Sequence, residues 1–298
     1  MQDRKVDLTG ALWLTGFALF LALNQVMIKV TNGGFGPIFF AGLRSAGAAV
    51  VLGVWIWANP RLTWPSLVHW RSGLLLSIFF FVEFFALFLA LDWTTVSRAS
   101  ILFYTMPMWL AVMSHFYLPS DTLTLRKGAG LICAFGGVVW AIVLRPDSGE
   151  ANYGGDIAAL VGAMGWAAIA LTMKISPLRY EPPEHGLLWQ LVLSAVFFLI
   201  AAPFMGPLIR ELEPIHLWGL AFHIFLVAST GFLVWFWLLS KYSASGVASF
   251  GFISPVAAVG LGAILLQEEI NFWTIGALVL VALGIFLINS TPKRRGAL

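Results

Sequence analysis

Charged residues are scarce in this chain, and cysteine is almost absent. Asp, Glu, Lys and Arg make up 10% of its 298 residues, whereas soluble domains have about 25%. The single cysteine, Cys133, excludes a disulfide framework. No GxxxxGK[ST] loop is present, so the ATPase signature is missing. With 60% hydrophobic residues and a mean hydropathy of +0.89, the composition predicts an all-α integral membrane protein.

Long apolar segments are what the sequence has in place of charge. A stretch of about 20 apolar residues crosses a hydrocarbon core of roughly 30 Å, and we expect ten such spans. They are Leu8–Val30, Gly36–Ala58, Ser72–Leu91, Val96–Leu118, Lys127–Leu144, Gly155–Ile175, Gly186–Met205, Ile215–Ser240, Ser245–Leu266 and Phe272–Asn289. The connecting loops are short, so we expect no soluble catalytic lobe.

Lys and Arg are distributed unequally between the two sides of this predicted bundle. If the N-terminus lies inside, the opposite side carries only Lys29, Arg98, Arg145 and Arg210. The inner side carries Arg4, Lys5, Arg61, Arg71, Arg126, Lys127, Lys174, Arg179, Lys241, Lys293, Arg294 and Arg295. Because basic residues favour cytoplasmic loops, we predict that both termini lie in the cytoplasm. We expect the protein to lie in the inner membrane of the cell. The net charge of +3 reflects this excess and indicates no nucleic-acid partner.

The second half of the chain repeats the first. At a shift of 148 positions the matched pairs include Ser97 with Ser245, Pro107 with Pro255, Gly128 with Gly276 and Gly136 with Gly284. Such internal similarity predicts two repeats, at 1–148 and 149–298, each with five helices. An odd number of spans inverts the second copy, and inverted repeats are typical of transporters with a midplane site. Duplicated channels and membrane enzymes remain alternatives.

Several segments carry a family resemblance. Arg44 after Pro37, the stretch ALDWTTVSRASILFYTMPMWLAV and the stretch SASGVASFGFISPVAAVGLGAILLQEE resemble the drug/metabolite transporter superfamily, specifically its EamA-type ten-helix exporters. The overall pattern is most similar to bacterial aromatic amino acid exporters. The family commonly has an acidic residue soon after the proline-bearing helix. Glu268 and Glu269 match this feature in the second half, whereas the first half departs from it with Pro119-Ser120-Asp121.

Polar side chains at membrane depth are candidates for a binding site, because an ionised group there is costly unless it faces water or a partner. Glu83 is the sharpest candidate, since no other carboxylate lies mid-span. It could receive an amino group, carry a proton, or pair with Arg44. Arg44 could recognise a cargo carboxylate or tie helix ends together. His223 could titrate or simply pack.

Aromatic rings complete the predicted site. Trp13, Phe17 and Phe20 form one stripe that ends in Asn24, and such rings could stack on a flat cargo. Many of the other rings are expected to face lipid or the interface. The predicted substrate-binding residues are Asn24, Phe79, Glu83, Tyr104, Trp166, Gln190, Trp235 and Phe252, with Arg44 and His223 as charge partners.

Two prolines are predicted to act as hinges. Pro107 and Pro255 occupy equivalent positions in the middle of predicted helices, where proline removes a hydrogen bond and kinks the chain. The glycines at 128, 136, 276 and 284 are instead predicted to permit close helix contact.

Other functional classes fit less well. Asp92, Asp121, Asp147 and Asp156 fall in predicted loops, which leaves Glu83 without the second carboxylate of an intramembrane protease. No HExxH motif or charged filter ring is present. We therefore predict a transporter without cofactor or metal that exports aromatic or hydrophobic amino acids by alternating access. The alternative is an exporter or facilitator of other amphipathic metabolites or drug-like cations. Expected partners are the cargo and the lipid bilayer, with protons left open.

Overall fold

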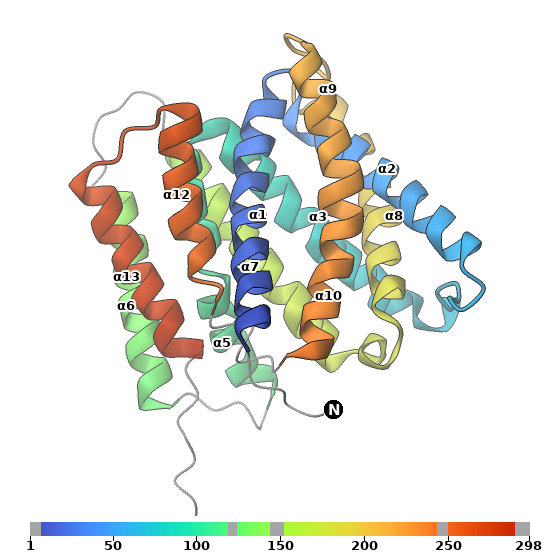
Figure 1. Cartoon of the computed structure of the whole chain (residues 1–298), viewed down its shortest axis with the longest axis horizontal. Coiled ribbons are helices and arrows are strands. Elements are labelled where there is room, and N and C mark those ends of the chain that lie inside the picture. The colour runs from blue at the N-terminus through green and yellow to red at the C-terminus, as the bar shows by residue number, and fades with distance from the viewer. Residues whose placement is uncertain (1–6, 119–123, 144–151, 243–249, 290–298) are drawn as a thin grey trace, which may run out of the picture.

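The protein folds as a bundle of helices (Figure 1). The computed structural model describes residues 7–118, 124–143, 152–242 and 250–289. The main helices are α1 (Leu8–Asn32), α2 (Pro37–Ala58), α3 (Trp70–Trp93), α4 (Val96–Phe103), α5 (Met106–Tyr117), α6 (Leu125–Val143), α7 (Tyr153–Ile175), α8 (Pro183–Ala201), α9 (Pro214–Ala221), the π-helix η4 (Phe222–Gly231), α10 (Phe232–Lys241), α12 (Ile253–Leu266) and α13 (Phe272–Asn289). Three single-turn 3-10 helices are η1 (Leu67–His69), η2 (Pro177–Tyr180) and η3 (Ala202–Phe204).

The expected number of membrane spans is confirmed. Within the described residues, nine helical stretches are long and apolar enough to cross a membrane, and Ile253–Leu266 is a shorter apolar helix. Several predicted features lie outside those residues: the repeat boundary at 148, and Pro119, Ser120, Asp121, Arg145, Asp147 and Ser245. The N-terminal pair Arg4 and Lys5 and the C-terminal Lys293, Arg294 and Arg295 lie outside as well.

Side chains that cap helices explain where two equivalent spans begin. Asp7 accepts a hydrogen bond from the Gly10 backbone N–H (2.7 Å) at the start of α1. Asn152 accepts one from the Gly155 N–H (2.9 Å) at the start of α7. Asp and Asn are favoured at this position, because their oxygens satisfy amide groups that have no partner within the helix.

The fourth span is two helices instead of the single helix predicted over Val96–Leu118. α4 ends at Phe103, and α5 begins at Met106 with Pro107 in its first turn. Proline is favoured there because its missing N–H would have no partner within the helix. Pro255 likewise lies in the first turn of α12. Both prolines therefore begin helices, and their role as hinges stays a prediction.

The eighth span contains a π-helix that the sequence did not predict. η4 continues α9 into α10 without a break. Two of its hydroxyls bond to carbonyls five residues back: Ser229 to Ile224 (2.7 Å) and Thr230 to Phe225 (2.8 Å). The π-helix is rare, and its usual form, a single-turn bulge within an α-helix, occurs frequently at functional sites.

α6 and α13 lie side by side at one edge of the bundle (Figure 1). A Cβ atom added to Gly284 would lie 2.6 Å from the Ala134 backbone nitrogen, so this glycine permits close contact, as predicted. Gly276 packs closely against Trp140. The prediction for Gly128 and Gly136 is wrong, because a Cβ added to either would meet nothing within 4 Å. Gly130 and Gly137 face α13 in their place.

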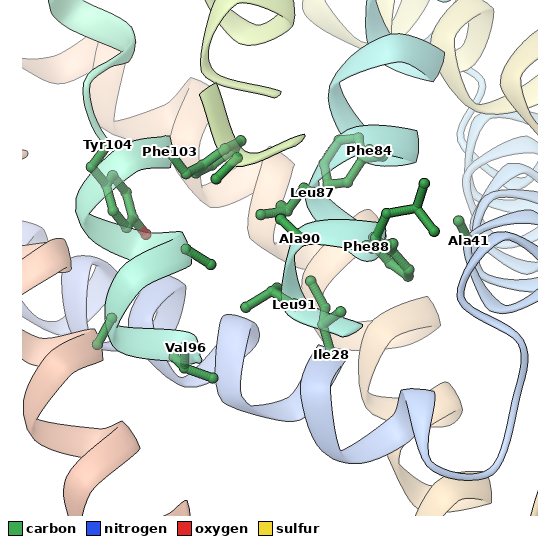
Figure 2. Packing of buried hydrophobic residues seen from close by; sticks show 14 of the residues in the cluster. Ile28, Ala41, Phe84, Leu87, Phe88, Ala90, Leu91, Val96, Phe103 and Tyr104 are labelled. Atoms are coloured by element: carbon green, nitrogen blue, oxygen red, sulfur yellow. The ribbon is translucent and has the colours of Figure 1, made fainter. Parts of the chain in front are cut away.

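α3 runs through the hydrophobic core. Its buried residues include Phe84, Leu87, Phe88 and Leu91. Figure 2 shows Phe88 on the side of α3 nearest Ala41 of α2, while Phe103 and Tyr104 lie on the neighbouring span. Because α3 packs against α7 and α8 of the second half and against α2 of the first, its side chains lie where the two halves meet.

Candidate functional site

Glu83 lies on α3 at its crossing with α7, and it is only 5% exposed. Gly165 of α7 rests on the Glu83 backbone, so that an added Cβ would lie 2.9 Å from Glu83 Cα. Gly162 lies one turn away, near the Glu83 carbonyl oxygen. Among the described residues, no hydrogen bond or ion pair reaches the Glu83 carboxylate. The sequence predicted that Glu83 avoids lipid, but it did not predict the close contact with α7.

Arg44 lies on α2 and is 1% exposed. Its guanidinium carbon sits 3.9 Å from the centre of the Phe84 ring and within 6 Å of Phe80 and Phe88. None of its three side-chain nitrogens has a hydrogen-bond partner among the described residues. Arg44 and Glu83 interact electrostatically, yet no nitrogen of one lies within 4.0 Å of an oxygen of the other. The direct ion pair that the sequence left open is therefore not formed.

His223 is the second residue of η4 and is completely buried. Its ring meets Phe40 edge to face, with centroids 5.0 Å apart. Both ring nitrogens lack a hydrogen bond of normal geometry within the described chain, although the Met27 backbone lies close enough to interact with the imidazole. The imidazole also interacts electrostatically with Arg44. His223 thus joins the same buried region as Arg44 and Glu83.

A second polar group surrounds the break between α4 and α5. The Tyr104 hydroxyl faces the side chains of Gln25 and Ser254, and Ser100 donates a hydrogen bond to Gln25 Oε1 (2.5 Å). Trp166 of α7 packs edge to face on Tyr104, with centroids 6.1 Å apart, and stacks on the ring of Phe103. Tyr104 and Trp166 are thus brought together as predicted, and Gln25 is a contact that the site prediction missed.

The remaining predicted residues are more scattered. Asn24 is buried and its Oδ1 has no partner in the described part of the chain. Gln190 bonds to the carbonyl of Gly186 in its own helix (3.0 Å). Phe79 is half-buried, and Phe252 is 36% exposed. Trp235 stacks on Phe17, with centroids 5.5 Å apart. Within the described residues, no hydrogen bond, ion pair or ring contact links them to Glu83, and their place in one site stays a prediction.

The aromatic stripe of α1 borders an open apolar groove. The groove has a volume of about 450 Å³ and lies between α1 on one side and η4 with α10 on the other. It is lined by Thr9, Leu12, Trp13, Gly16, Phe17, Phe20, Leu226, Thr230, Gly231 and Val234.

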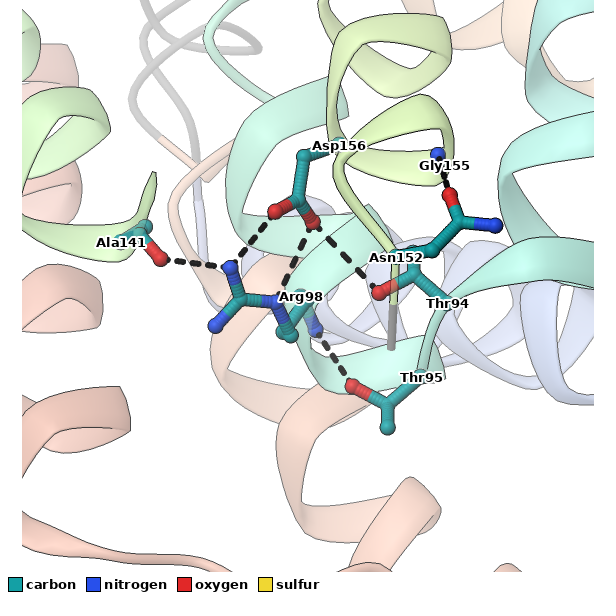
Figure 3. Close-up of polar contacts among 7 residues, drawn as sticks. All are labelled: Thr94, Thr95, Arg98, Ala141, Asn152, Gly155 and Asp156. Atoms are coloured by element: carbon teal, nitrogen blue, oxygen red, sulfur yellow. Dashed lines mark hydrogen bonds and ion pairs between the residues drawn. The ribbon is translucent and has the colours of Figure 1, made fainter. Parts of the chain in front are cut away.

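The two halves are tied together at the end of the bundle where α3 stops and α4 starts, which we call the α3–α4 end. Arg98 of α4 forms a two-bond ion pair with Asp156 of α7 (3.1 and 2.6 Å; Figure 3). It also donates to the carbonyl of Ala141 (2.6 Å). Thr94 adds a longer bond to Asp156 (3.5 Å). Asp156 is fully buried, so this ion pair is shielded from solvent.

Glu268 makes another contact between the halves at the same end. Its carboxylate accepts hydrogen bonds from the backbone N–H groups of Val96 and Ser97 (2.5 and 2.9 Å) and from the Ser97 hydroxyl (2.6 Å). It therefore caps α4, where a negative charge is stabilised by free amide groups and the helix dipole. Only the family resemblance drew attention to Glu268 in the sequence.

Arg210 and Asp92 form a more exposed ion pair between the halves, with Nη–Oδ distances of 2.6 and 2.9 Å. The hydrogen bond to Asp92 raises the pKa of Arg210 above its usual value. Arg210 also donates to the carbonyl of Asn32 (3.1 Å). Among the described residues, no group of three or more His, Cys, Asp or Glu side chains could hold a metal ion.

Comparison with known proteins places these features in a family. The chain is 26% identical over 290 residues to the uncharacterized transporter YoaV of Bacillus subtilis (strain 168), covering 95% of this chain and 98% of that protein. It is 27% identical to the uncharacterized transporter YvbV of the same organism, covering 96% and 93%. A solved structure described only as the crystal structure of a protein matches with a TM-score of 0.64 at 17% identity, covering 94% of this chain and 96% of that one.

Both halves of the chain match one family separately. Residues 8–143 and 153–290 each match the EamA-like transporter family, and the two matched segments together account for most of the chain. This protein, built from two copies of one membrane domain, therefore belongs to the EamA-like transporter family of the drug/metabolite transporter superfamily.

Proposed function

We propose that this membrane transporter exports aromatic and hydrophobic amino acids. The observation that carries the proposal is the pair Glu83 and Arg44, which are buried among phenylalanines without touching each other. Buried charges without partners are costly. An amino acid supplies an ammonium for Glu83, a carboxylate for Arg44 and an apolar side chain for the surrounding rings. A zwitterionic cargo with an apolar side chain matches all three features.

We further propose that transport proceeds by alternating access across the inner membrane, with both termini in the cytoplasm. The excess of Lys and Arg on one side supports this orientation, which would place the α3–α4 end outside. The contacts of Glu268 with Ser97 and of Arg98 with Asp156 join the two halves at that end. Opening toward the outside would require both contacts to break.

Drug-like cations are the second candidate cargo, because Glu83 alone could hold a cation among aromatic rings. Two results separate these cargoes. Uptake of radiolabelled phenylalanine, tyrosine, tryptophan and leucine into liposomes, with glycine for comparison, supports the amino acid proposal. Uptake of an aromatic amine alone supports the cation. Saturable counterflow distinguishes a carrier from a channel, and a pH gradient tests whether protons are exchanged.

Glu83→Gln removes the charge and keeps the shape of the side chain. We expect it to weaken cargo affinity by about tenfold or more, the usual effect of losing a hydrogen bond to a charged group. Loss of affinity at every pH indicates contact with the ammonium. Preserved affinity without a response to the pH gradient indicates a proton carrier. The control is Glu269→Gln, because Glu269 is exposed, and wild-type kinetics in Glu83→Gln would reject both roles.

A further inference from the structure

Arg44 is a buried cation that lacks an anion. A guanidinium remains protonated in proteins and carries five N–H donors in a planar fork. In this protein none of its three nitrogens has an acceptor among the described residues, although the side chain is 1% exposed. The Phe84 ring covers one face of the guanidinium, but an aromatic face does not satisfy N–H groups in the guanidinium plane. The N–H groups along the edge of the guanidinium are therefore still available to an acceptor.

η4 brings a second unsatisfied donor to the same place. Gly47, one turn after Arg44 on α2, lies so close to η4 that an added Cβ would be 2.5 Å from Ile224 Cδ1. Residues three apart share one face of a helix, and Ile224 directly follows His223. This close approach of α2 and η4 brings the imidazole into the same buried region as the guanidinium, near enough for the two to interact electrostatically.

The buried state of His223 is unusual, because nearly all buried polar atoms have a hydrogen-bond partner. Its Nδ1 and Nε2 both lack a hydrogen bond of normal geometry within the described chain, and the Met27 backbone nearby interacts with the ring without forming one. The rings of Phe40 and Phe222 meet it edge to face, at 5.0 and 5.5 Å between centroids, and so fix its orientation without bonding to its nitrogens. A neutral imidazole in this position can donate one hydrogen bond.

We propose that Arg44 and His223 form a subsite for the carboxylate of the cargo. Arg44 would bind the two carboxylate oxygens through its planar fork, which matches a carboxylate, and His223 would donate one further N–H. Glu83 lies near enough to interact with Arg44, so in its ionised form it opposes a dianion such as phosphate and favours a monoanion or a zwitterion. This inference deepens the proposed function, since it names the chemical group that the site requires.

Four probes that share a phenyl ring test the subsite in purified wild-type protein in lipid nanodiscs. Phenylalanine has both charged groups, and 3-phenylpropionate lacks the ammonium. Phenylalaninamide and 2-phenylethylamine lack the carboxylate. We expect the two carboxylates to bind about tenfold or more tightly than the amide and the amine, because a charged hydrogen bond is lost in the latter. Equal binding of the amide or the amine, or binding of none of the probes, would overturn the subsite.

Two substitutions locate the effect. His223→Asn and Arg44→Gln are expected to weaken binding of 3-phenylpropionate by about tenfold. The controls are His115→Asn, an exposed histidine beside Phe116, and Arg71→Gln, an exposed arginine over Trp70. If Arg44→Gln does not fold, the subsite is tested by His223→Asn and by the four probes on the wild-type protein. Unchanged 3-phenylpropionate binding in His223→Asn contradicts the part assigned to His223.

The results also separate this subsite from the amino acid proposal. Binding of 3-phenylpropionate that depends on His223, without binding or transport of phenylalanine, leaves the carboxylate subsite standing and removes the amino acid cargo. If phenylalanine is transported and transport is unaffected in both His223→Asn and a folded Arg44→Gln, the amino acid cargo stands and the carboxylate subsite is removed.

Discussion

Two helix pairs that the repeat makes equivalent are packed in opposite ways. At a shift of 149 positions, Gly165 of α7 corresponds to Gly16 of α1, and at the shift of 148, Glu83 of α3 corresponds to Gly231 at the end of η4. α7 lies so close to α3 that a Cβ on Gly165 would be 2.9 Å from the Glu83 backbone. A Cβ on Gly16 would meet nothing within 4 Å, because the 450 Å³ groove separates α1 from α10.

Side-chain size explains the difference between the two pairs. Across the groove, α1 meets the opposite span through large rings: Trp13 with Trp237, Phe17 with Trp235 and Phe20 with Phe222, at 5.3, 5.5 and 5.8 Å between centroids. Such rings keep the backbones apart, whereas glycine lets them approach. One inherited pattern thus gives a closed pair and an open pair. Inverted repeats in transporters supply this kind of asymmetry about a midplane site.

The largest effect is expected when the closed pair is forced apart. Gly165→Leu places a side chain against the Glu83 backbone, which cannot move aside without shifting α3. Overpacking of this kind costs about 3 kcal/mol or more when backbone must move. Thermal unfolding in detergent measures the loss. Gly136→Leu is the matched control, because a Cβ at Gly136 meets nothing within 4 Å, and equal stability of the two variants would contradict the close packing.

A slightly smaller effect should appear at the starts of the two spans. Asp156 and Asp7 are equivalent in the repeat, and each accepts a bond from the residue that ends a neighbouring helix, Thr94 or Tyr242. Asp156 also holds Arg98. Asp156→Asn breaks that buried ion pair, at a cost of about 3 kcal/mol. Asp7→Asn should cost less than about 1 kcal/mol, because Asn is also a good cap.

Thermal unfolding and hydrogen exchange in α4 compare these two variants. Faster exchange near Arg98 in Asp156→Asn, and not in Asp7→Asn, is the expected pattern. An equal loss of stability in both variants would mean that the Arg98 ion pair adds nothing to the closed pair.

The smallest effect on stability is expected in the open pair. Gly16→Leu places its side chain in the groove, so the free energy of unfolding should change by less than about 0.5 kcal/mol, as at most surface positions. Transport should nevertheless slow by about tenfold, or roughly 1.4 kcal/mol in barrier height, if α1 must close on α10 during the cycle. Gly136→Leu again serves as control. A normal transport rate in Gly16→Leu would show that this pair stays open throughout.

The number of spans and the repeat were predictable because they depend on segment length and on ordered matches along the chain. That Glu83 avoids lipid was also predictable, since an ionisable group in mid-span is costly there. Its lack of a partner was not, because that depends on how closely Gly165 brings α7 to α3. Glycine spacing alone did not reveal which face of α6 meets α13, so Gly128 and Gly136 were assigned wrongly. The π-helix has no comparable sequence signal.

The contacts at the α3–α4 end have a consequence for synthesis of the chain. Val96 and Ser97 receive their cap from Glu268, a residue 172 and 171 positions later. When the first repeat leaves the ribosome, the first turn of α4 still lacks that carboxylate. The partner of Arg98 is synthesised sooner, because Asp156 follows it by 58 positions, at the start of the second repeat. The first repeat therefore inserts with this end incomplete, and only translation of the second repeat finishes it.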